Sequence, residues 1–119
     1  MSAFCCSRIS RIGSDNRFSQ SVTHNGVVYC VGKTCKTEKG VGAQTAGALR
    51  AIDEMLADAG TSKSKLLSAT IWLSSMSDYA KMNEEWVKWL DPENVPVRAC
   101  IEAGLVKDAL VEIKVTAAL

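Results

Sequence analysis

The sequence contains a single histidine, His24, and an odd number of cysteines, so it is poor in the side chains that usually bind zinc. None of the cysteines shows paired metal-ligand spacing; they are Cys5, Cys6, Cys30, Cys35 and Cys100. This pattern argues against a Cys/His zinc site. It also predicts reduced thiols and therefore a cytoplasmic protein.

The sequence also lacks any apolar run near the roughly 20 residues of a membrane-spanning helix. Its net charge is only +1, with acids and bases interspersed, which favours neither nucleic acid nor a membrane surface as partner. No repeat or linker divides the 119 residues, of which 47% are hydrophobic, so we predict one folded domain over 1–119. The N-terminus lacks the apolar core of a secretory signal, and 7–12 is better explained as a first strand.

The first third of the chain has the pattern of three strands. Residues 8–12 alternate between polar and apolar side chains, which is typical of a short half-buried strand. A second strand is predicted over 18–24, followed by the hairpin signal Asn25-Gly26. The returning strand, 27–32, is almost continuously apolar and is therefore expected to be buried.

Two helices and three further strands are predicted in the rest of the chain. A helix over 43–59, with a stop at Gly60, has the apolar stripe Ala48, Leu49, Ile52, Met55 and Leu56. A strand over 67–73 precedes a second helix, capped by Ser77 and ended by Asp91-Pro92. Helical spacing places Tyr79, Met82, Trp86 and Leu90 on that helix's apolar stripe. Strands over 97–101 and 111–113 complete the order β-β-β-α-β-α-β-β.

This order predicts an α+β fold with a mixed sheet and two helices on one face. The uncovered face would be half apolar, which suggests an oligomer. If 103–109 forms a hairpin turn near Val106, Cys100 lies opposite Glu112 and Arg98 lies two residues away. A guanidinium, a thiol and a carboxylate would then share the uncovered face.

Motifs along most of the chain resemble the YjgF/RidA family of reactive-intermediate deaminases, also called endoribonuclease L-PSP. The matching pieces, in order, are 18–22, 28–32, Gln44-Thr45 with 58–60, Asn83, Pro96-Val97-Arg98-Ala99-Cys100 and Val111-Glu112-Ile113. The resemblance implies a chorismate-mutase-like fold assembled as a homotrimer. Its sheets would line an inner barrel, and its active clefts would lie between neighbouring subunits.

The resemblance also implies an activity. The family hydrolyses 2-imino acids such as 2-iminobutanoate and 2-iminopropanoate, formed from enamines, to 2-oxo acids and ammonia, without metal or organic cofactor. By position, Arg98 matches the arginine that holds the substrate carboxylate, Cys100 the cleft cysteine, and Glu112 the glutamate associated with water and the imine. Phe18 stands where the family often has tyrosine, and Val31 stands where serine often precedes Gly32. Both changes make the substrate-binding pocket more apolar.

Each of these residues also has a plainer interpretation. Arg98 could be ion-paired with Glu112 or Glu102. Glu112 lies between core positions, where partial desolvation would suit a general base, but it could simply accept hydrogen bonds. Beside an arginine, the Cys100 thiol is expected to be somewhat acidified, yet a pocket-lining role is favoured over a nucleophilic one because no base is near.

Other functions remain open at this point. The same chemistry could act on another enamine or imine intermediate of catabolism. A non-catalytic trimer could use the arginine to bind or sense small carboxylates. RNA cleavage is disfavoured by the near-neutral charge and the lack of a stripe of basic and aromatic residues. A chaperone-like role is also attributed to the family.

Overall fold

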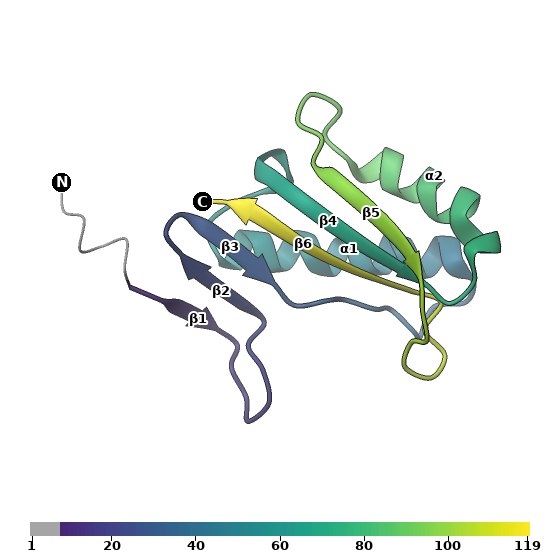
Figure 1. The fold of residues 1–119 in the computed structure, drawn as a ribbon, viewed down its shortest axis with the longest axis horizontal. Coiled ribbons are helices and arrows are strands. Elements are labelled where there is room, and N and C mark those ends of the chain that lie inside the picture. The colour runs from purple at the N-terminus through teal and green to yellow at the C-terminus, as the bar shows by residue number, and fades with distance from the viewer. Residues whose placement is uncertain (1–7) are drawn as a thin grey trace.

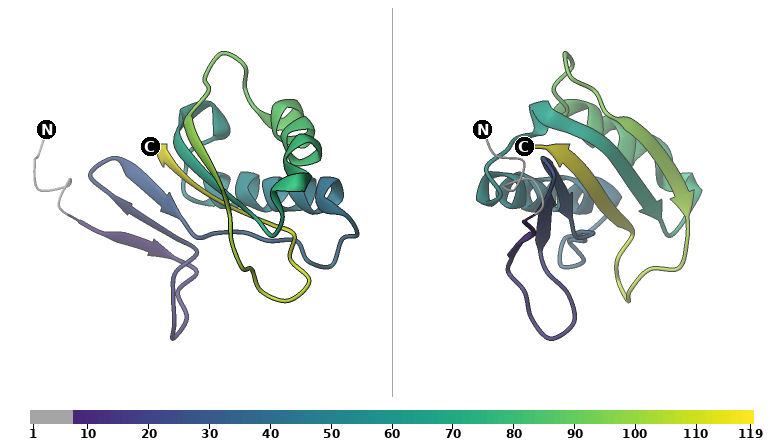
Figure 2. Two further views of the ribbon diagram at one scale, coloured as in Figure 1. Left: turned by 45° about the vertical axis from the view of Figure 1, so that its right-hand side comes forward. Right: turned by 60° about the vertical axis from the view of Figure 1, so that its left-hand side comes forward.

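Two helices, α1 and α2, lie on one side of a six-stranded mixed sheet in the computed structural model, which describes residues 8–119 (Figure 1). The strands are β1 (Ser10–Ile12), β2 (Ser21–His24), β3 (Val27–Cys30), β4 (Leu66–Leu73), β5 (Val97–Glu102) and β6 (Val111–Ala118). The helices are α1 (Val41–Asp58) and α2 (Tyr79–Trp89). The predicted α+β order and the sheet covered on one face are confirmed (Figure 2).

The strand order in the sheet is β1-β2-β3-β6-β4-β5. Asn25 and Gly26 have φ angles of 51° and 78°, as the tight turn between β2 and β3 requires, and this hairpin is confirmed. The first strand begins at Ser10, two residues later than the predicted 8–12, and Ser7 lies outside the described residues. The expected burial of all of β3 is wrong, because Tyr29 points away from the helices and is 46% exposed.

The start of α2 differs from the prediction. Ser77 does not cap the helix. It lies inside a 3₁₀ turn, Met76–Asp78, and the first backbone amides of this turn donate to side chains other than that of Ser77. The Ser75 hydroxyl accepts a hydrogen bond from the Ser77 amide, and Glu102 at the end of β5 accepts one from the Met76 amide at 2.7 Å. Long-range contact with β5 therefore fixes where α2 begins, which local sequence does not reveal.

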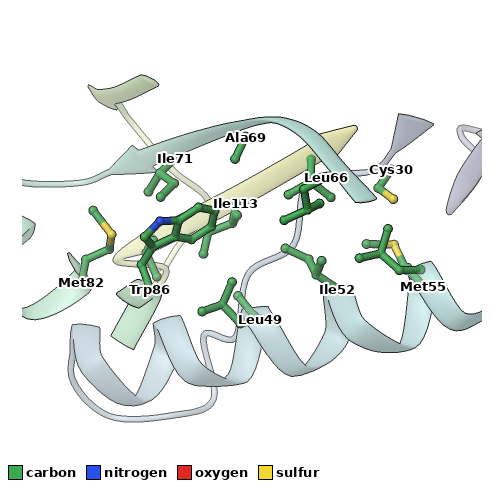
Figure 3. Close-up of a cluster of buried hydrophobic side chains, with 14 of the residues drawn as sticks. Cys30, Leu49, Ile52, Met55, Leu66, Ala69, Ile71, Met82, Trp86 and Ile113 are labelled. Atoms are coloured by element: carbon green, nitrogen blue, oxygen red, sulfur yellow. The ribbon is translucent and has the colours of Figure 1, made fainter. Parts of the chain in front are cut away.

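The core lies between the sheet and the helices (Figure 3). The predicted stripe of α1 is buried there, and Gly60, with a φ of 88°, follows the helix as expected. From α2, Met82 and Trp86 enter the same core. Every second residue of β4 and β6 faces it, namely Ala69, Ile71, Leu73, Val111, Ile113, Val115 and Ala117. The opposite side chains of these strands face away from the helices.

The predicted hairpin between the last two strands is wrong. β4 lies between them, parallel to β5 and antiparallel to β6. At the end of β4 the Leu73 carbonyl accepts from the Ala103 amide at 2.9 Å, and the Ser74 amide donates to the Leu110 carbonyl at 3.0 Å. The connection therefore passes over the end of β4. The eight residues 103–110 are enough to bridge the ~10 Å between strands two places apart, so the length of the connection does not distinguish this path from a hairpin.

Gln44 on α1 joins the two loops that flank the sheet. Its side chain is only 3% exposed, and its Nε2 donates to the carbonyls of Glu38 and Asp108, both at 3.0 Å. Its Oε1 accepts from the Leu110 amide at 2.8 Å. One buried amide thus satisfies three backbone groups just before β6 begins.

We predict that Gln44→Ala lowers the free energy of unfolding by about 3 kcal/mol, because it leaves these backbone groups without partners. Urea unfolding followed by circular dichroism would measure the change. Glu54→Ala, at an exposed position of the same helix, is the matched control and should change stability little. A loss below ~1 kcal/mol for Gln44→Ala would show that water replaces the lost partners.

Candidate functional site

Arg98 on β5 points toward α2, where its guanidinium is held by neutral groups. Its NH1 donates to the Asn83 Oδ1 at 2.8 Å and its NH2 donates to the Tyr79 hydroxyl oxygen at 2.6 Å. The guanidinium carbon also lies 5.5 Å from the ring centre of Trp86 and 5.6 Å from that of Tyr79. Its orientation is therefore set by hydrogen bonds and cation–π contacts together.

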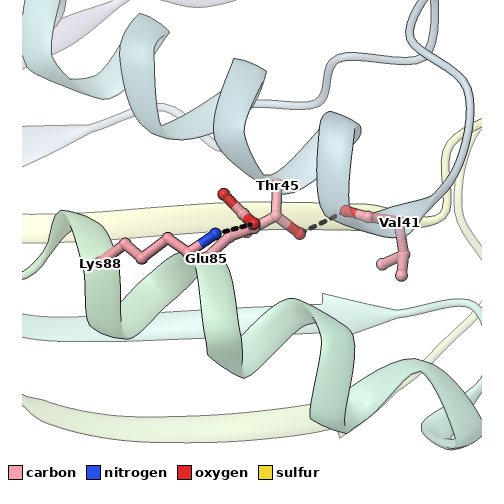
Figure 4. Close-up of polar contacts among 4 residues, drawn as sticks. All are labelled: Val41, Thr45, Glu85 and Lys88. Carbon is pink, nitrogen blue, oxygen red and sulfur yellow. Dashed lines mark hydrogen bonds and ion pairs between the residues drawn. The ribbon is translucent and has the colours of Figure 1, made fainter.

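No carboxylate neutralises Arg98 within residues 8–119. The one ion pair in this part of the chain joins Lys88 and Glu85 on α2 at 3.1 Å (Figure 4, which also shows the Thr45 hydroxyl donating to the Val41 carbonyl). Glu102 accepts from the Met76 amide instead of pairing with Arg98. The alternative of an arginine paired with Glu102 or Glu112 is therefore wrong. A guanidinium has five N–H donors, so about three remain for a ligand.

A surface pocket lies beside this arginine's partners. It has a volume of about 570 Å³ and is lined by Tyr79, Ala80, Asn83, Glu84, Val87 and Lys88. Two of these residues, Tyr79 and Asn83, are the ones that hold the guanidinium. A ligand in this pocket would therefore lie close to the unneutralised charge of Arg98.

Cys100 faces the same side of the sheet as Arg98, two residues further along β5, and packs against the core. Burial raises the pKa of the Cys100 thiol, and the nearby Arg98 lowers it by a smaller amount. The expected acidification is therefore wrong, because desolvation of the thiolate outweighs the attraction of the arginine. A thiol of this kind suits a pocket wall better than a nucleophile.

Glu112 lies on the opposite face of the sheet from Arg98 and Cys100. It neighbours Trp72 on β4, whereas Arg98 neighbours Ala69, which faces the helices. Its carboxylate lies so close to Gly32 that a Cβ at that position would collide with Oε2. Only glycine therefore allows the Glu112 carboxylate to come this close to the backbone at position 32. The expected shared face for the three functional groups is wrong: within one chain they form two separate halves.

The remaining predicted site residues also lie apart from Arg98. Val31 packs against the core. Phe18 is half exposed in the loop before β2, where the Asp15 carboxylate accepts from the amides of Arg17 and Phe18 at 2.7 Å and 2.9 Å. These backbone hydrogen bonds lower the pKa of Asp15. Phe18 is thus held by a tight turn, and about half of the residue is exposed to solvent.

The sequence patterns do not reveal the three side chains that orient Arg98. Helical spacing predicts Tyr79 and Trp86 on an apolar stripe, and Asn83 is singled out only as part of a family motif. Their spacing of four and three residues does place all three on one face of a helix. A polar Asn between two aromatic residues that carry polar atoms was the available signal for a hydrogen-bonding face.

Among residues 8–119, no three His, Cys, Asp or Glu side chains gather where they could hold a metal ion. In the same range, no helix is both long and apolar enough to cross a membrane.

The fold and this site define a small α+β domain with an oriented arginine at a surface pocket. The model of the family described as Endoribonuclease L-PSP matches residues 8–119. A RutC family protein of Haemophilus ducreyi is 43% identical over 113 residues, which cover 93% of this chain and 97% of that protein. The RutC family protein YoaB of Escherichia coli K12 is 38% identical over 112 residues, which cover 93% of this chain and 98% of that protein.

Solved structures agree with these relatives. NMB1025 of Neisseria meningitidis, a member of the YjgF protein family, superposes with a TM-score of 0.92 at 38% identity, covering 95% of this chain and 96% of that one. The Rid family protein YyfA of Yersinia pestis superposes with a TM-score of 0.83 at 30% identity, and the match covers 89% of this chain and 90% of that one. This chain therefore belongs to the YjgF/RidA family, as its motifs indicated.

We predict that Cys100 is alkylated slowly at neutral pH. The thiolate is the reactive form, and a raised pKa leaves a smaller fraction of the thiol ionised at each pH, so labelling should be slower than that of a small unburied thiol such as N-acetylcysteine over the whole range. Iodoacetamide labelling from pH 7 to 10, quantified by peptide mass spectrometry, measures this. Cys100→Ser identifies the peptide signal, and a labelling midpoint at or below the pH found for N-acetylcysteine would contradict the expectation.

Proposed function

We propose that this protein is a cofactor-independent deaminase that hydrolyses 2-imino acids of the 2-iminobutanoate and 2-iminopropanoate type to 2-oxo acids and ammonia. The observation that carries the proposal is Arg98, which is oriented by Asn83 and Tyr79 but has no carboxylate partner within residues 8–119. A fixed, unneutralised guanidinium beside an open pocket suits a small carboxylate ligand. Membership of the YjgF/RidA family supports the same chemistry.

In this reaction Arg98 binds the substrate carboxylate through paired N–H···O bonds and so places the neighbouring C=N group. Water adds to the carbon of the protonated imine and gives up one proton to form a carbinolamine. That proton is returned to the carbinolamine nitrogen, which then leaves as ammonia while the hydroxyl proton passes to solvent and the C=O bond forms. Glu112 is the residue that we assign to orienting the water and accepting its proton. Because imines hydrolyse readily, positioning and modest base assistance are sufficient.

The two halves of this site would have to come from different chains. Arg98 and Cys100 face α2, whereas Glu112 and Gly32 lie on the other face of the same sheet. A homotrimer in which Arg98 of one subunit meets Glu112 and Gly32 of its neighbour would bring them together. The exposed side chains of Tyr29, Val97 and Ile101 on the uncovered face support such an assembly, because burying them against a neighbour is favourable.

A non-catalytic carboxylate-binding protein is the second candidate. It is favoured by the fact that one chain carries only the binding half, with Arg98 but not Glu112 near the pocket on α2. It predicts saturable binding of 2-oxo acids without release of ammonia. A third possibility keeps the deaminase chemistry and changes the substrate to another enamine or imine intermediate. In each case we propose a small-molecule ligand and a cytoplasmic location.

We predict that Arg98→Ala lowers kcat/KM for imino-acid hydrolysis by about 100-fold or more, because it removes charge-assisted bonds to the carboxylate. An amino-acid oxidase would generate a panel of imino acids, and semicarbazide would trap what remains. Arg98→Lys keeps the charge but loses the paired geometry, and it should recover only part of the activity.

Arg50→Ala, at an exposed position of α1, is the matched control and should act like wild type. Circular dichroism would verify that each variant is folded. Full activity in folded Arg98→Ala would refute the assignment. Absence of activity across the panel in wild type, together with binding of 2-oxo acids, would instead favour the carboxylate-binding protein.

We predict that two inactive variants complement each other when their subunits mix. Arg98→Ala and Glu112→Gln chains, co-refolded in equal amounts, should recover about one quarter of wild-type activity. A cleft is intact only where the chain that supplies the arginine carries Glu112→Gln and its neighbour carries Arg98→Ala. Each variant refolded alone is the control. If a single chain contained the whole site, mixing would restore nothing.

A further inference from the structure

The Tyr79 hydroxyl is placed so that the direction of its proton is decided by Arg98. The NH2 group of Arg98 lies 2.6 Å from the hydroxyl oxygen of Tyr79. A guanidinium can only donate, so the oxygen accepts and the hydroxyl proton must point elsewhere. Within residues 8–119 the hydroxyl of Tyr79 has no other side-chain or backbone partner. The proton is therefore available to an acceptor outside the chain.

The surroundings of Tyr79 allow such an acceptor to reach it. The residue is 39% exposed and lines the 570 Å³ pocket together with Asn83. Its ring is fixed by the guanidinium carbon of Arg98, which lies 5.6 Å from the ring centre. The hydroxyl thus has a fixed position beside the remaining N–H donors of Arg98. Because its oxygen accepts a hydrogen bond from the charged guanidinium, the O–H bond is polarised and becomes a better donor.

We propose that Tyr79 is a substrate-binding residue, whose hydroxyl donates a hydrogen bond to the same carboxylate that Arg98 holds. One carboxylate oxygen accepts from the guanidinium and the other accepts from the phenol. The pair selects ligands with a planar carboxylate and fixes the rotation of that group, and hence the direction in which the reacting carbon faces. This inference rests on the proposed function, because it requires Arg98 to bind a carboxylate.

The chain offers a matched pair of substitutions for this idea. Tyr79→Phe removes the hydroxyl and keeps the ring that contacts Arg98. Ser64→Ala also removes one hydroxyl, at an exposed position of the turn before β4, which does not line the pocket, so it is the matched control. Arg98→Gln is the third variant, since it removes the charge on which the proposed function depends.

The experiment measures the Kd of 2-oxobutanoate by calorimetry, and KM and kcat for 2-iminobutanoate, with wild type and the three variants. Loss of one hydrogen bond to a charged group should weaken binding by about tenfold or more in Tyr79→Phe. KM should rise by a similar factor while kcat changes less than about twofold, because the bond is made in both ground and transition states. Ser64→Ala should match wild type.

The possible outcomes separate this proposal from the proposed function. If Arg98→Gln abolishes binding but Tyr79→Phe binds like wild type, the role of Tyr79 is refuted and the carboxylate site stands. If Tyr79→Phe lowers kcat with Kd unchanged, the hydroxyl acts only by supporting Arg98 and the proposal is also refuted. If wild type and Arg98→Gln bind 2-oxobutanoate equally or not at all, the proposed function fails and this inference fails with it.

Discussion

The position of β4 inside the sheet determines where every functional side chain can act. Ala69, Ile71 and Leu73 are buried against the helices, so this strand needs a neighbour on each side, and β5 and β6 supply them. Because side chains alternate along a strand, the register with β4 then assigns each residue of β5 and β6 to a face. Arg98 falls on the helix side and Glu112 on the other. Core packing, rather than local sequence, separates the charge from the carboxylate.

The neutral environment of Arg98 is the second consequence of this arrangement. Asn83 and Tyr79 accept its hydrogen bonds without cancelling its charge, and the ring of Trp86 covers part of it. Such partners stop the side chain from moving and leave the positive charge for a ligand. They also reduce the conformational entropy that ligand binding would otherwise cost. An ion pair with a carboxylate would have fixed the arginine equally well but would have removed its attraction for an anion.

Local patterns predicted most of the elements, and long-range pairing explains the errors. Period-two alternation correctly placed Arg98 and Cys100 opposite to Val97 and Ile101, and helical spacing found the buried stripe of α1. The predicted pairing of β5 with β6 was wrong because a connection of this length can form either a hairpin or a path across the end of β4. The Ser77 cap was wrong because Glu102, distant in sequence, binds the start of the turn. Whether Glu112 shares a face with Arg98 depends on those pairings, so local patterns could single out these residues as candidates but could not predict their grouping.

The separation of the two halves also bears on how binding and catalysis relate in this protein. A single chain has the arginine, its neutral partners and the pocket on α2, which are the parts that the proposed carboxylate binding requires. The carboxylate that would handle water lies on the other face, against Gly32, where it cannot reach a ligand held by its own Arg98. Hydrolysis on this scheme requires the uncovered sheet face to meet the helix-side edge of another copy. Assembly would then bury the exposed apolar side chains of that face and complete the site in one step, so that stability and activity depend on the same interface.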